Sequence, residues 1–393
     1  MTKFCPECSS RYDEKGLEIC PDDGVRLRRI ADDSDDDMIG RVLDDRWEIE
    51  ARLGKGGMGT VYLARQTTVD RQVAVKMLRP ALTTNDSYVE RFMREANIAT
   101  SLSHPHCVTV FDFGQTDEEL LYLVMEFLDG SPLAQHLDER NLPLRDILII
   151  GTQICSALAA AHEANIVHRD LKPDNVYLLD VAGGNQFVKV LDFGISKVLD
   201  GDNTPVTQSG QIFGTPAYMS PEQCQSSDVD PRSDLYSLGI ILYELVAGRP
   251  PFAHTTPLKT LMAHMNSEVR PLEQLGIPLP DGVEEIILKL LEKQPEERFQ
   301  SAVDVRKELE EAARDIGDEA AERVPANTSD GDSVEAITLD SDGLEIGDDD
   351  QDASTDVWAG EVSEAGEEER EEELAHSPHS RETSRAGAMA ATK

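Results

Sequence analysis

The sequence predicts an α+β fold, in which a small antiparallel strand-rich lobe with one helix precedes a larger helical lobe. In the first part, β-branched and aromatic residues lie on either side of a glycine-rich turn, and in the second part apolar residues recur at helical spacing. The expected strands are Trp47–Leu53, Thr60–Arg65, Gln72–Leu78, Cys107–Phe113 and Leu120–Glu126. The expected helices are Ser87–Leu102, Asp146–Ala164, Arg232–Ala247, Leu258–Ser267, Val283–Leu291 and Ala302–Ala312.

The helix expected over Ser87–Leu102 has a signal at each end. Its first residues, Ser87-Tyr88-Val89-Glu90, have the form of a capping box, in which the serine and glutamate side chains bind free backbone N–H groups. After it comes His104-Pro105, and proline disfavours helical backbone in the residue before it. The pattern therefore predicts a helix that ends just before this dipeptide.

Four zones differ in composition along the 393 residues. Residues 1–30 form a cysteine-bearing, zinc-ribbon-like segment, 31–46 an acidic linker, 47–312 the two-lobed domain and 313–393 an acidic tail. The tail holds 24 acidic and 6 basic residues. Its low apolar content predicts disorder, and the acidic stretch 31–38 is expected to stay unfolded for the same reason.

The charge of the chain limits its partners. It has 76 Asp and Glu against 37 Lys and Arg, a net charge of −39. Nucleic acids and anionic membranes attract cationic proteins, so neither is an expected partner, and basic protein substrates are mildly favoured. The longest apolar stretch, within 147–161, is interrupted by polar residues and is expected to be too short and too polar to insert into a membrane.

The cysteines and the N-terminus predict a cytoplasmic location. Three of the six cysteines lie within the first 20 residues and three are scattered, which is not a disulfide framework. The first ten residues contain no apolar signal-peptide core. A reducing compartment fits both observations.

A glycine-rich segment follows the first expected strand. Its pattern is G-x-G-x-x-G-x-V, whose glycines let a backbone approach triphosphate closely. A dinucleotide-binding loop shares this core but would lead into a helix, whereas a strand-like stretch follows here. A strand–turn–strand flap over a nucleotide is therefore favoured, with these residues as its contacts: Leu53, Gly54, Lys55, Gly56, Gly57, Met58, Gly59, Thr60 and Val61.

Val73-Ala74-Val75-Lys76 ends an expected strand with a lysine. Such a lysine can hold the α- and β-phosphates of a nucleotide if a carboxylate fixes it. Glu95 is the preferred partner because it lies on the apolar stripe of the following helix. Glu90 is the alternative, although the capping box gives it another role.

Another expected strand runs through Met125 and Glu126 into a short connection. In a two-lobed enzyme this segment would be the hinge, whose backbone near Glu126 and Leu128 binds adenine while Met125 guards the inner pocket. Leu178 is expected to form the floor of the same pocket. Plain core packing is the competing interpretation for each of these apolar side chains.

The most informative stretch is His168-Arg169-Asp170-Leu171-Lys172-Pro173-Asp174-Asn175, followed by Asp192-Phe193-Gly194. Asp170 can orient a hydroxyl and take its proton, and Lys172 can neutralise a phosphate. Asn175 and Asp192 offer the oxygen ligands that Mg²⁺ prefers. The spacing thus predicts a phosphoryl-transfer site.

Further along the chain, polar residues are expected to brace or regulate this site. Glu222 and Arg298 are predicted to form a buried ion pair, and Asp234 to hold the backbone of the 168–175 loop. In the segment between Asp192 and Glu222, the candidate phosphorylation sites are Thr204, Thr207, Ser209 and Thr215. Thr207 and Ser209 rank first, because they lie mid-loop within reach of Arg169.

The N-terminal pattern Cys-x2-Cys-x11-Cys-x2-Asp places Cys5, Cys8, Cys20 and Asp23 at the spacing of a small zinc ribbon. Thiolates suit Zn²⁺, and a carboxylate is an acceptable fourth ligand. The competing interpretations are a decayed ribbon and free thiols. A closed site of this kind would be structural or serve protein contact.

With these motifs together, residues 47–312 resemble a eukaryotic-like (Hanks-type) protein kinase of the bacterial serine/threonine branch. The motifs GxGxxGxV, VAVK, HRDLKPDN and DFG stand intact, and Ser220-Pro221-Glu222 replaces the family's APE. The resemblance implies a bilobal kinase fold, ATP with Mg²⁺ or Mn²⁺, an adenine contact for Ala74, and Ser/Thr-directed transfer signalled by Lys172. It also implies autophosphorylation on the segment between Asp192 and Glu222, during which the chain would form a transient homodimer. A pseudokinase would lack a catalytic residue, and none is lost; an adaptor acting through the ribbon and the tail is the alternative function.

Overall fold

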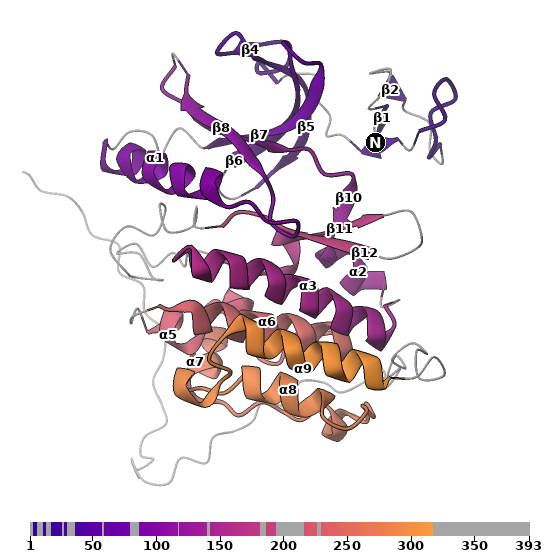
Figure 1. Cartoon of the computed structure of the whole chain (residues 1–393), viewed down its shortest axis with the longest axis vertical. Helices are drawn as coiled ribbons and strands as arrows, with labels where there is room; N and C mark the ends of the chain where they lie inside the picture. Colours follow the sequence, from indigo (N-terminus) through magenta and orange to yellow (C-terminus); the bar gives the residue numbers. More distant parts are fainter. Residues whose placement is uncertain are drawn as a thin grey trace, which may run out of the picture. The chain divides into compact units, whose positions relative to one another are not determined.

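The computed structural model describes residues 3–5, 11–12, 17–25, 27–29, 36–56, 59–78, 86–116, 118–139, 142–180, 186–193, 216–225 and 229–316. The chain divides into two units, residues 1–330 and 331–393, and all described residues belong to the first. The disorder predicted for the tail therefore concerns residues that lie almost wholly outside this set. Within it, a strand-rich lobe and a helical lobe follow one another along the chain (Figure 1).

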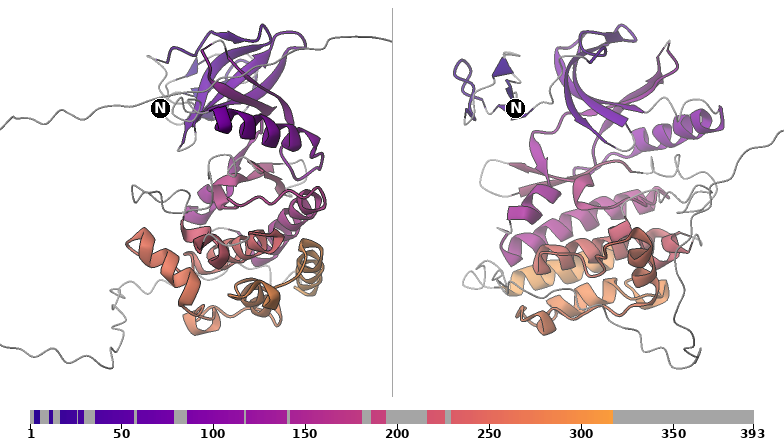
Figure 2. Two further views of the ribbon diagram at one scale, coloured as in Figure 1. Left: turned by 90° about the vertical axis from the view of Figure 1, so that its left-hand side faces the viewer. Right: turned by 180° about the vertical axis from the view of Figure 1, so that it is seen from behind.

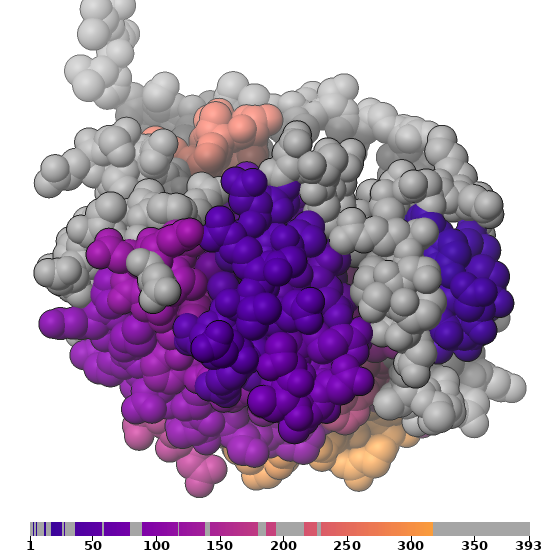
Figure 3. Space-filling view, turned by 90° about the horizontal axis from the view of Figure 1, so that it is seen from above, coloured from indigo at the N-terminus to yellow at the C-terminus, as the bar shows by residue number. Residues whose placement is uncertain are grey.

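A six-stranded antiparallel sheet forms the first lobe, in the order β4-β5-β6-β7-β9-β8. Its strands are β4 (Val42–Leu43), β5 (Trp47–Lys55), β6 (Gly59–Gln66), β7 (Arg71–Leu78), β8 (Val110–Gln115) and β9 (Leu121–Glu126). All five predicted strands are present, although β8 begins at Val110 rather than Cys107. Seen from above, this lobe occupies the middle of the face, and atoms of the helical lobe show at its margins (Figure 3).

Helix α1 (Asp86–Ser101) covers one face of the sheet. Phe92, Ala96 and Ala99 point into an apolar cluster with strand residues such as Leu123. The opposite face of the sheet has its own cluster, around Trp47. Because β9 contributes buried side chains to both clusters, it is apolar at nearly every position, as expected of a strand covered on both faces.

The capping box predicted at Ser87 is misplaced. Helix α1 begins at Asp86, so Ser87 lies inside the first turn rather than before it. Sequence patterns locate a helix terminus only to within one or two residues, because several polar residues near it can serve as the cap. Glu90 is exposed and Glu95 is buried, which agrees with the preference for Glu95 as the inward-facing carboxylate.

The linker predicted over 31–46 is too long. Residues 36–46 lie against the sheet, and β4 pairs with β5. Asp36 accepts hydrogen bonds from Tyr62 Oη at 3.1 Å and from Arg52 Nη1 at 3.1 Å, and Met38 packs against the Trp47 cluster. The acidic composition does not predict these contacts. A carboxylate with two hydrogen-bond donors and a few apolar neighbours can be ordered even in a stretch whose composition is typical of unfolded chains.

The helical lobe starts with α2 (Leu133–Glu139) and α3 (Leu144–Glu163), and ends with α5 (Pro221–Cys224), α6 (Pro231–Ala247), α7 (Pro257–Asn266), α8 (Val283–Leu290) and α9 (Ala302–Asp315). The long predicted helices are all present (Figure 2). Helix α9 continues past Ala312, so the domain reaches three residues into the predicted tail. The described part of the lobe also contains the short 3-10 turns Pro173–Asn175, Pro216–Tyr218, Glu273–Leu275 and Pro295–Glu297.

Helix α3 is the core of this lobe. Among the described residues it is the one helix that is long and apolar enough to cross a membrane by length and composition alone, with 20 residues and an 18-residue stretch of mean hydropathy 1.4. The prediction that this stretch is too short and too polar was therefore wrong. More than half of it is buried, since it packs against α6, α9 and β12, as the core helix of a folded domain does.

The described residues also form two small three-stranded sheets. In one, β10 (Gly130–Pro132), β11 (Val176–Asp180) and β12 (Gln186–Val190) join in that order and carry the loops of the candidate site. In the other, near the N-terminus, β1 (Lys3–Phe4) lies between β2 (Arg11–Tyr12) and β3 (Arg28–Arg29). Neither sheet was predicted, since strands of two to five residues are too short to show an alternation.

Candidate active site

The loop between α3 and β11 is held from below by Asp234 of α6. Its Oδ2 accepts the backbone N–H of His168 at 2.8 Å and its Oδ1 that of Arg169 at 2.9 Å. Arg169 has a φ of 66°, a left-handed conformation that costs free energy in a residue with a side chain. The two hydrogen bonds to one buried carboxylate offset that cost. The predicted role of Asp234 is confirmed.

His168 is a structural residue, as predicted. Its side chain is fully buried, and Nε2 lies 2.7 Å from the carbonyl oxygen of Leu191. Its ring meets the ring of Phe193 edge-on, with centroids 4.8 Å apart. The imidazole therefore ties the 168–175 loop to the segment that carries Asp192.

Asp170, Lys172 and Asn175 converge at the other end of this loop. Lys172 Nζ donates to Asp170 Oδ2 at 2.8 Å. Asn175 Nδ2 donates to the backbone oxygen of Asp170 at 2.8 Å and to its Oδ2 at 3.2 Å. Both of these contacts use the amide nitrogen, whereas a cation binds an amide through its oxygen. The three side chains form one cluster, with a carboxylate at its centre.

Asp192 lies beside this cluster. Leu191 donates its N–H to the carbonyl of Asn175 at 2.8 Å, which brings the two candidate metal ligands close together, one just before β11 and the other just after β12. Asp192 has a φ of 60°, a second left-handed residue at the site. Burial alone would raise the pKa of its carboxyl group, but the charge and hydrogen bond of Lys76 outweigh burial and hold the pKa below its usual value.

The partner of Lys76 differs from the prediction. Lys76 Nζ donates to Asp192 Oδ2 at 2.6 Å, whereas Glu95 Oε1 accepts from Arg94 Nη2 at 3.1 Å. Within the described part of the chain, no ion pair joins Lys76 to Glu95. Two carboxylates could pair with this ammonium. Here Arg94 pairs with Glu95, while Lys76 pairs with the partly buried Asp192.

The glycine-rich hairpin joins β5 to β6, as predicted. A side chain at Gly59 would place its Cβ 2.0 Å from the carbonyl oxygen of Met77, so the close approach of β6 to β7 requires glycine there. A Cβ at Gly54 would meet nothing within 4 Å. The hairpin thus leaves open space beside Gly54, which a phosphate group could use. Gly57 and Met58 lie outside the described residues.

The side chains expected around adenine lie in two apolar clusters, one in each lobe. Ala74 and Met125 are opposite each other on β7 and β9, and both are buried. Leu53, Val61 and Leu128 pack against the same cluster, and Leu178 is buried on β11. Ala74 is the smallest side chain of this group and leaves room for a flat ring. Behind Met125, a small apolar cavity is lined by residues that include Ala99 and Phe193.

Glu222 and Arg298 form the predicted ion pair. Arg298 Nη1 and Nη2 each lie 2.8 Å from a different carboxylate oxygen of Glu222, a bidentate geometry, and the arginine side chain has no exposed surface. Ser233 adds a third hydrogen bond, at 2.6 Å. Burial would raise the pKa of Glu222, but Arg298 holds it below its usual value. A charge buried in this way is tolerated because every oxygen has a partner.

Sequence reasoning missed one contact of the loop. Gln223 Nε2 donates to the carbonyl oxygen of Arg169 at 2.6 Å and so ties α5 to the backbone beside Asp170. The candidate phosphorylation sites Thr204, Thr207, Ser209 and Thr215 lie outside the described residues. So does Gly194.

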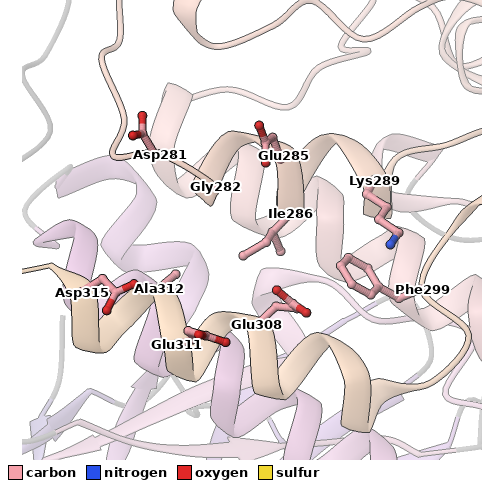
Figure 4. A pocket seen from close by; sticks show the side chains of 10 residues that line it. All are labelled: Asp281, Gly282, Glu285, Ile286, Lys289, Phe299, Glu308, Glu311, Ala312 and Asp315. Atoms are coloured by element: carbon pink, nitrogen blue, oxygen red, sulfur yellow. The ribbon is translucent and has the colours of Figure 1, made fainter.

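Another hollow lies away from this site, between α8 and α9 (Figure 4). Carboxylates surround it: Asp281, Glu285, Glu308, Glu311 and Asp315. They would repel the negative charge of a nucleotide, which excludes this hollow as the phosphate site.

Near the N-terminus, three of the four predicted zinc ligands meet. Ligand atoms of Cys5, Cys20 and Asp23 lie within 4.8 Å of one another, and both cysteines are buried. Tyr12 Oη lies 3.2 Å from the sulfur of Cys20. Burial would raise the pKa of Cys20, but Tyr12 and backbone N–H groups hold it below its usual value. Cys8 lies outside the described residues.

The lysines, carboxylates and amide below a glycine-rich hairpin define the class of protein: a bilobal enzyme built to handle nucleotide phosphates. Comparison with known proteins supplies the family. The family model "Protein kinase domain" matches residues 47–308. The chain belongs to the protein kinase family.

Bacterial kinases are among its relatives. Serine/threonine-protein kinase pkn3 of Myxococcus xanthus is 40% identical over 281 residues, which make up 70% of this chain and 51% of the relative. Serine/threonine-protein kinase PknB of Mycobacterium leprae is 40% identical over 272 residues, 68% of this chain and 43% of the relative. The chain therefore spans about half or less of the length of these relatives. The crystal structure of the PknI kinase domain of Mycobacterium tuberculosis has 29% identity and a TM-score of 0.54, and covers 70% of this chain and 98% of that one.

Proposed function

We propose that this protein is an ATP-dependent serine/threonine protein kinase. The observation that carries the proposal is the cluster of Asp170, Lys172 and Asn175 beside Asp192, in a chain whose family transfers phosphoryl groups. In the reaction, the oxygen of a Ser or Thr hydroxyl attacks the γ-phosphorus of ATP. The bond between that phosphorus and the β,γ-bridging oxygen breaks, ADP leaves, and Asp170 accepts the hydroxyl proton.

The residues present fit a nucleotide and a divalent cation. Asp192 and Asn175 supply carboxylate and amide oxygens, the ligand types that Mg²⁺ or Mn²⁺ prefers. The cation would supply positive charge that balances the phosphates. Lys76 would hold the phosphates, and Lys172 would neutralise charge that develops on the transferred group. Space beside Gly54 and the small side chain of Ala74 accommodate the nucleotide.

The experiment that tests this proposal measures phosphate transfer from labelled ATP. The full-length protein with Mg²⁺ is expected to label itself or a basic carrier protein, and the Asp170→Asn variant is expected to lose about 10²–10⁴-fold of that rate. ADP binding by the variant should stay within about twofold of the wild type, since Asp170 acts on the hydroxyl. A wild type without transfer or ADP binding contradicts the kinase proposal, and a fully active variant contradicts the role of Asp170.

Regulation by loop phosphorylation is part of the proposal. Thr207 and Ser209 are the proposed autophosphorylation sites, and a transient homodimer would bring the loop of one copy to Asp170 of the other. Replacing both residues by Ala is expected to lower the transfer rate after preincubation with ATP. Equal rates would remove this claim.

We also propose that Cys5, Cys8, Cys20 and Asp23 hold a structural Zn²⁺ ion. The support is that three of these ligands, two buried thiols and one carboxylate, lie close together. A closed four-ligand site stabilises a small segment rather than catalysing a reaction. Metal analysis of the purified chain should find about one Zn²⁺ per molecule, and Cys5→Ser with Cys20→Ser should abolish it. Zinc-free protein with unchanged folding of residues 1–30 would contradict the site.

A further inference from the structure

At the end of β9, Glu126 pairs with Thr109 in an incomplete way. Its N–H donates to the carbonyl oxygen of Thr109 at 2.9 Å. In a regular antiparallel pair, the two residues exchange both backbone hydrogen bonds, so the N–H of Thr109 would return to the carbonyl of Glu126. Instead, that N–H donates to the carboxylate oxygen Oε1 of Glu126 at 2.7 Å. The side chain of Glu126 thus takes the place of its own carbonyl in this pair.

Lys189 of β12 holds this carboxylate. Its Nζ lies 2.6 Å from the same Oε1 and 3.1 Å from the carbonyl oxygen of Cys107. Lys189 is buried, and a buried ammonium is tolerated only when it is paired. The ammonium of Lys189 and the N–H of Thr109 therefore fix one rotamer of Glu126. If the ammonium were lost, the carboxylate could turn toward solvent and the Thr109 N–H could bind the Glu126 carbonyl.

The same strand leads to the candidate catalytic residues. Lys189 lies three positions before Asp192. Between them, Leu191 donates its N–H in a hydrogen bond to the carbonyl of Asn175. At one end of this short segment lies Asp192, the candidate metal ligand. At the other end, Lys189 contacts Glu126, in the segment that joins the two lobes. A side chain at position 189 is thus placed to couple the adenine side of the site to its phosphate side.

Resting on the proposed function, we propose that Lys189 is a positioning residue for the adenine ring. By holding the carboxylate of Glu126 on the N–H of Thr109, it keeps the Glu126 carbonyl available to accept a hydrogen bond from the 6-amino group of adenine. Lys189 contacts neither the ring nor the phosphates. It acts through Glu126, and its effect is confined to nucleotides that carry a 6-amino donor.

The test compares two nucleotides that differ only at this position. Calorimetry with Mg²⁺ gives the Kd of the full chain for ADP and for purine riboside diphosphate, which has hydrogen in place of the 6-amino group. One hydrogen bond contributes about 0.5–1.5 kcal/mol, so the wild type should prefer ADP by about 2- to 13-fold. Lys189→Met should abolish this preference while binding of the purine analogue stays within about twofold. Lys189→Arg should retain it, because the guanidinium can still hold the carboxylate.

A second variant keeps the test independent of folding at position 189. Glu126→Ala removes the carboxylate, so the Thr109 N–H can bind the Glu126 carbonyl, and the preference for ADP should again be lost. The inference is wrong if Lys189→Met and Glu126→Ala weaken the binding of both nucleotides equally, or if these variants retain the preference for ADP. It is also wrong if the wild type shows no preference for ADP. In each of these cases the kinase proposal stands. A wild type that binds neither nucleotide overturns the kinase proposal itself.

Discussion

The two lobes hold their functional charges in different ways. In the helical lobe, each carboxylate of the brace has several fixed donors: Asp234 takes two backbone N–H groups, and Glu222 takes both ends of Arg298 and a serine hydroxyl. In the strand-rich lobe, Lys76 pairs with Asp192 and Glu95 pairs with Arg94, one ion pair for each. The braces of the helical lobe match the prediction, whereas the pairing of Lys76 does not.

This difference follows from where the partners reside. Both partners of each brace belong to the helical lobe, so their distance is fixed by its packed core. Lys76 lies on β7, and its partner Asp192 follows β12 in the other lobe. In protein kinases, catalysis requires the lysine of this strand to pair with the helix glutamate while the DFG aspartate binds metal. The structure thus has a candidate catalytic loop that is held within one lobe, and a lysine of the other lobe that pairs with Asp192 rather than with Glu95.

The largest expected effect belongs to the brace. Arg298→Met leaves the Glu222 carboxylate buried without its cation, and breaking such a pair costs about 3–5 kcal/mol of unfolding free energy. Chemical denaturation of the two proteins measures the difference. The double variant Glu222→Met with Arg298→Met should recover part of the loss, because no charge is then left buried.

An arginine–glutamate pair on the surface provides the matched control. Arg41 Nη1 lies 2.7 Å from Glu118 Oε1, but both side chains are largely exposed. Arg41→Gln should therefore cost less than about 1 kcal/mol. If Arg298→Met costs no more than Arg41→Gln, the brace is not what makes the catalytic loop rigid.

The next effect tests the partner of Lys76. In the protein without nucleotide, a double-mutant cycle with Lys76→Met and Asp192→Asn should give a coupling free energy of about 0.5–3 kcal/mol in unfolding experiments. A cycle with Lys76→Met and Glu95→Gln should give less than about 0.3 kcal/mol, since no contact is lost. If the coupling free energy with Glu95 were larger than that with Asp192, the contrast between the two lobes would be reversed.

The predictions that succeeded rest on local patterns. Alternation around the glycine-rich turn gives β5, β6 and β7, and the spacing from Asp170 to Asp192 gives the composition of the site. Contacts between distant residues are harder to predict, because spacing along the chain does not specify them. Lys189 and Glu126 are 63 positions apart, and nothing in either neighbourhood singles out the other. Likewise, the Asp36 contacts depend on Tyr62 and Arg52, which the acidic composition of the linker does not reveal.

The last expected effect appears only on acidification and concerns His264 of α7, a fully buried imidazole in the same lobe as the brace. Its Nδ1 lies 3.0 Å from Tyr236 Oη, and Lys293 Nζ donates to its carbonyl oxygen at 2.9 Å. Burial, aided by the charge of Lys293, lowers the pKa of His264 to about 3. The unfolded chain binds a proton near pH 6.5 and the folded chain does not, so stability is present above pH 6.5 and falls as the pH drops below it.

This group alone should remove about 1.4 kcal/mol of unfolding free energy per pH unit between pH 6 and 4. Carboxylates add their own pH dependence, so the informative quantity is the difference in slope between the wild type and His264→Asn, measured by denaturation across this range. Tyr236→Phe removes the hydrogen bond but keeps the buried imidazole, and it should keep the wild-type slope. Equal slopes for the wild type and His264→Asn would mean that the imidazole takes up its proton in the folded lobe, and that this part of the helical lobe is less rigid than the brace beside it.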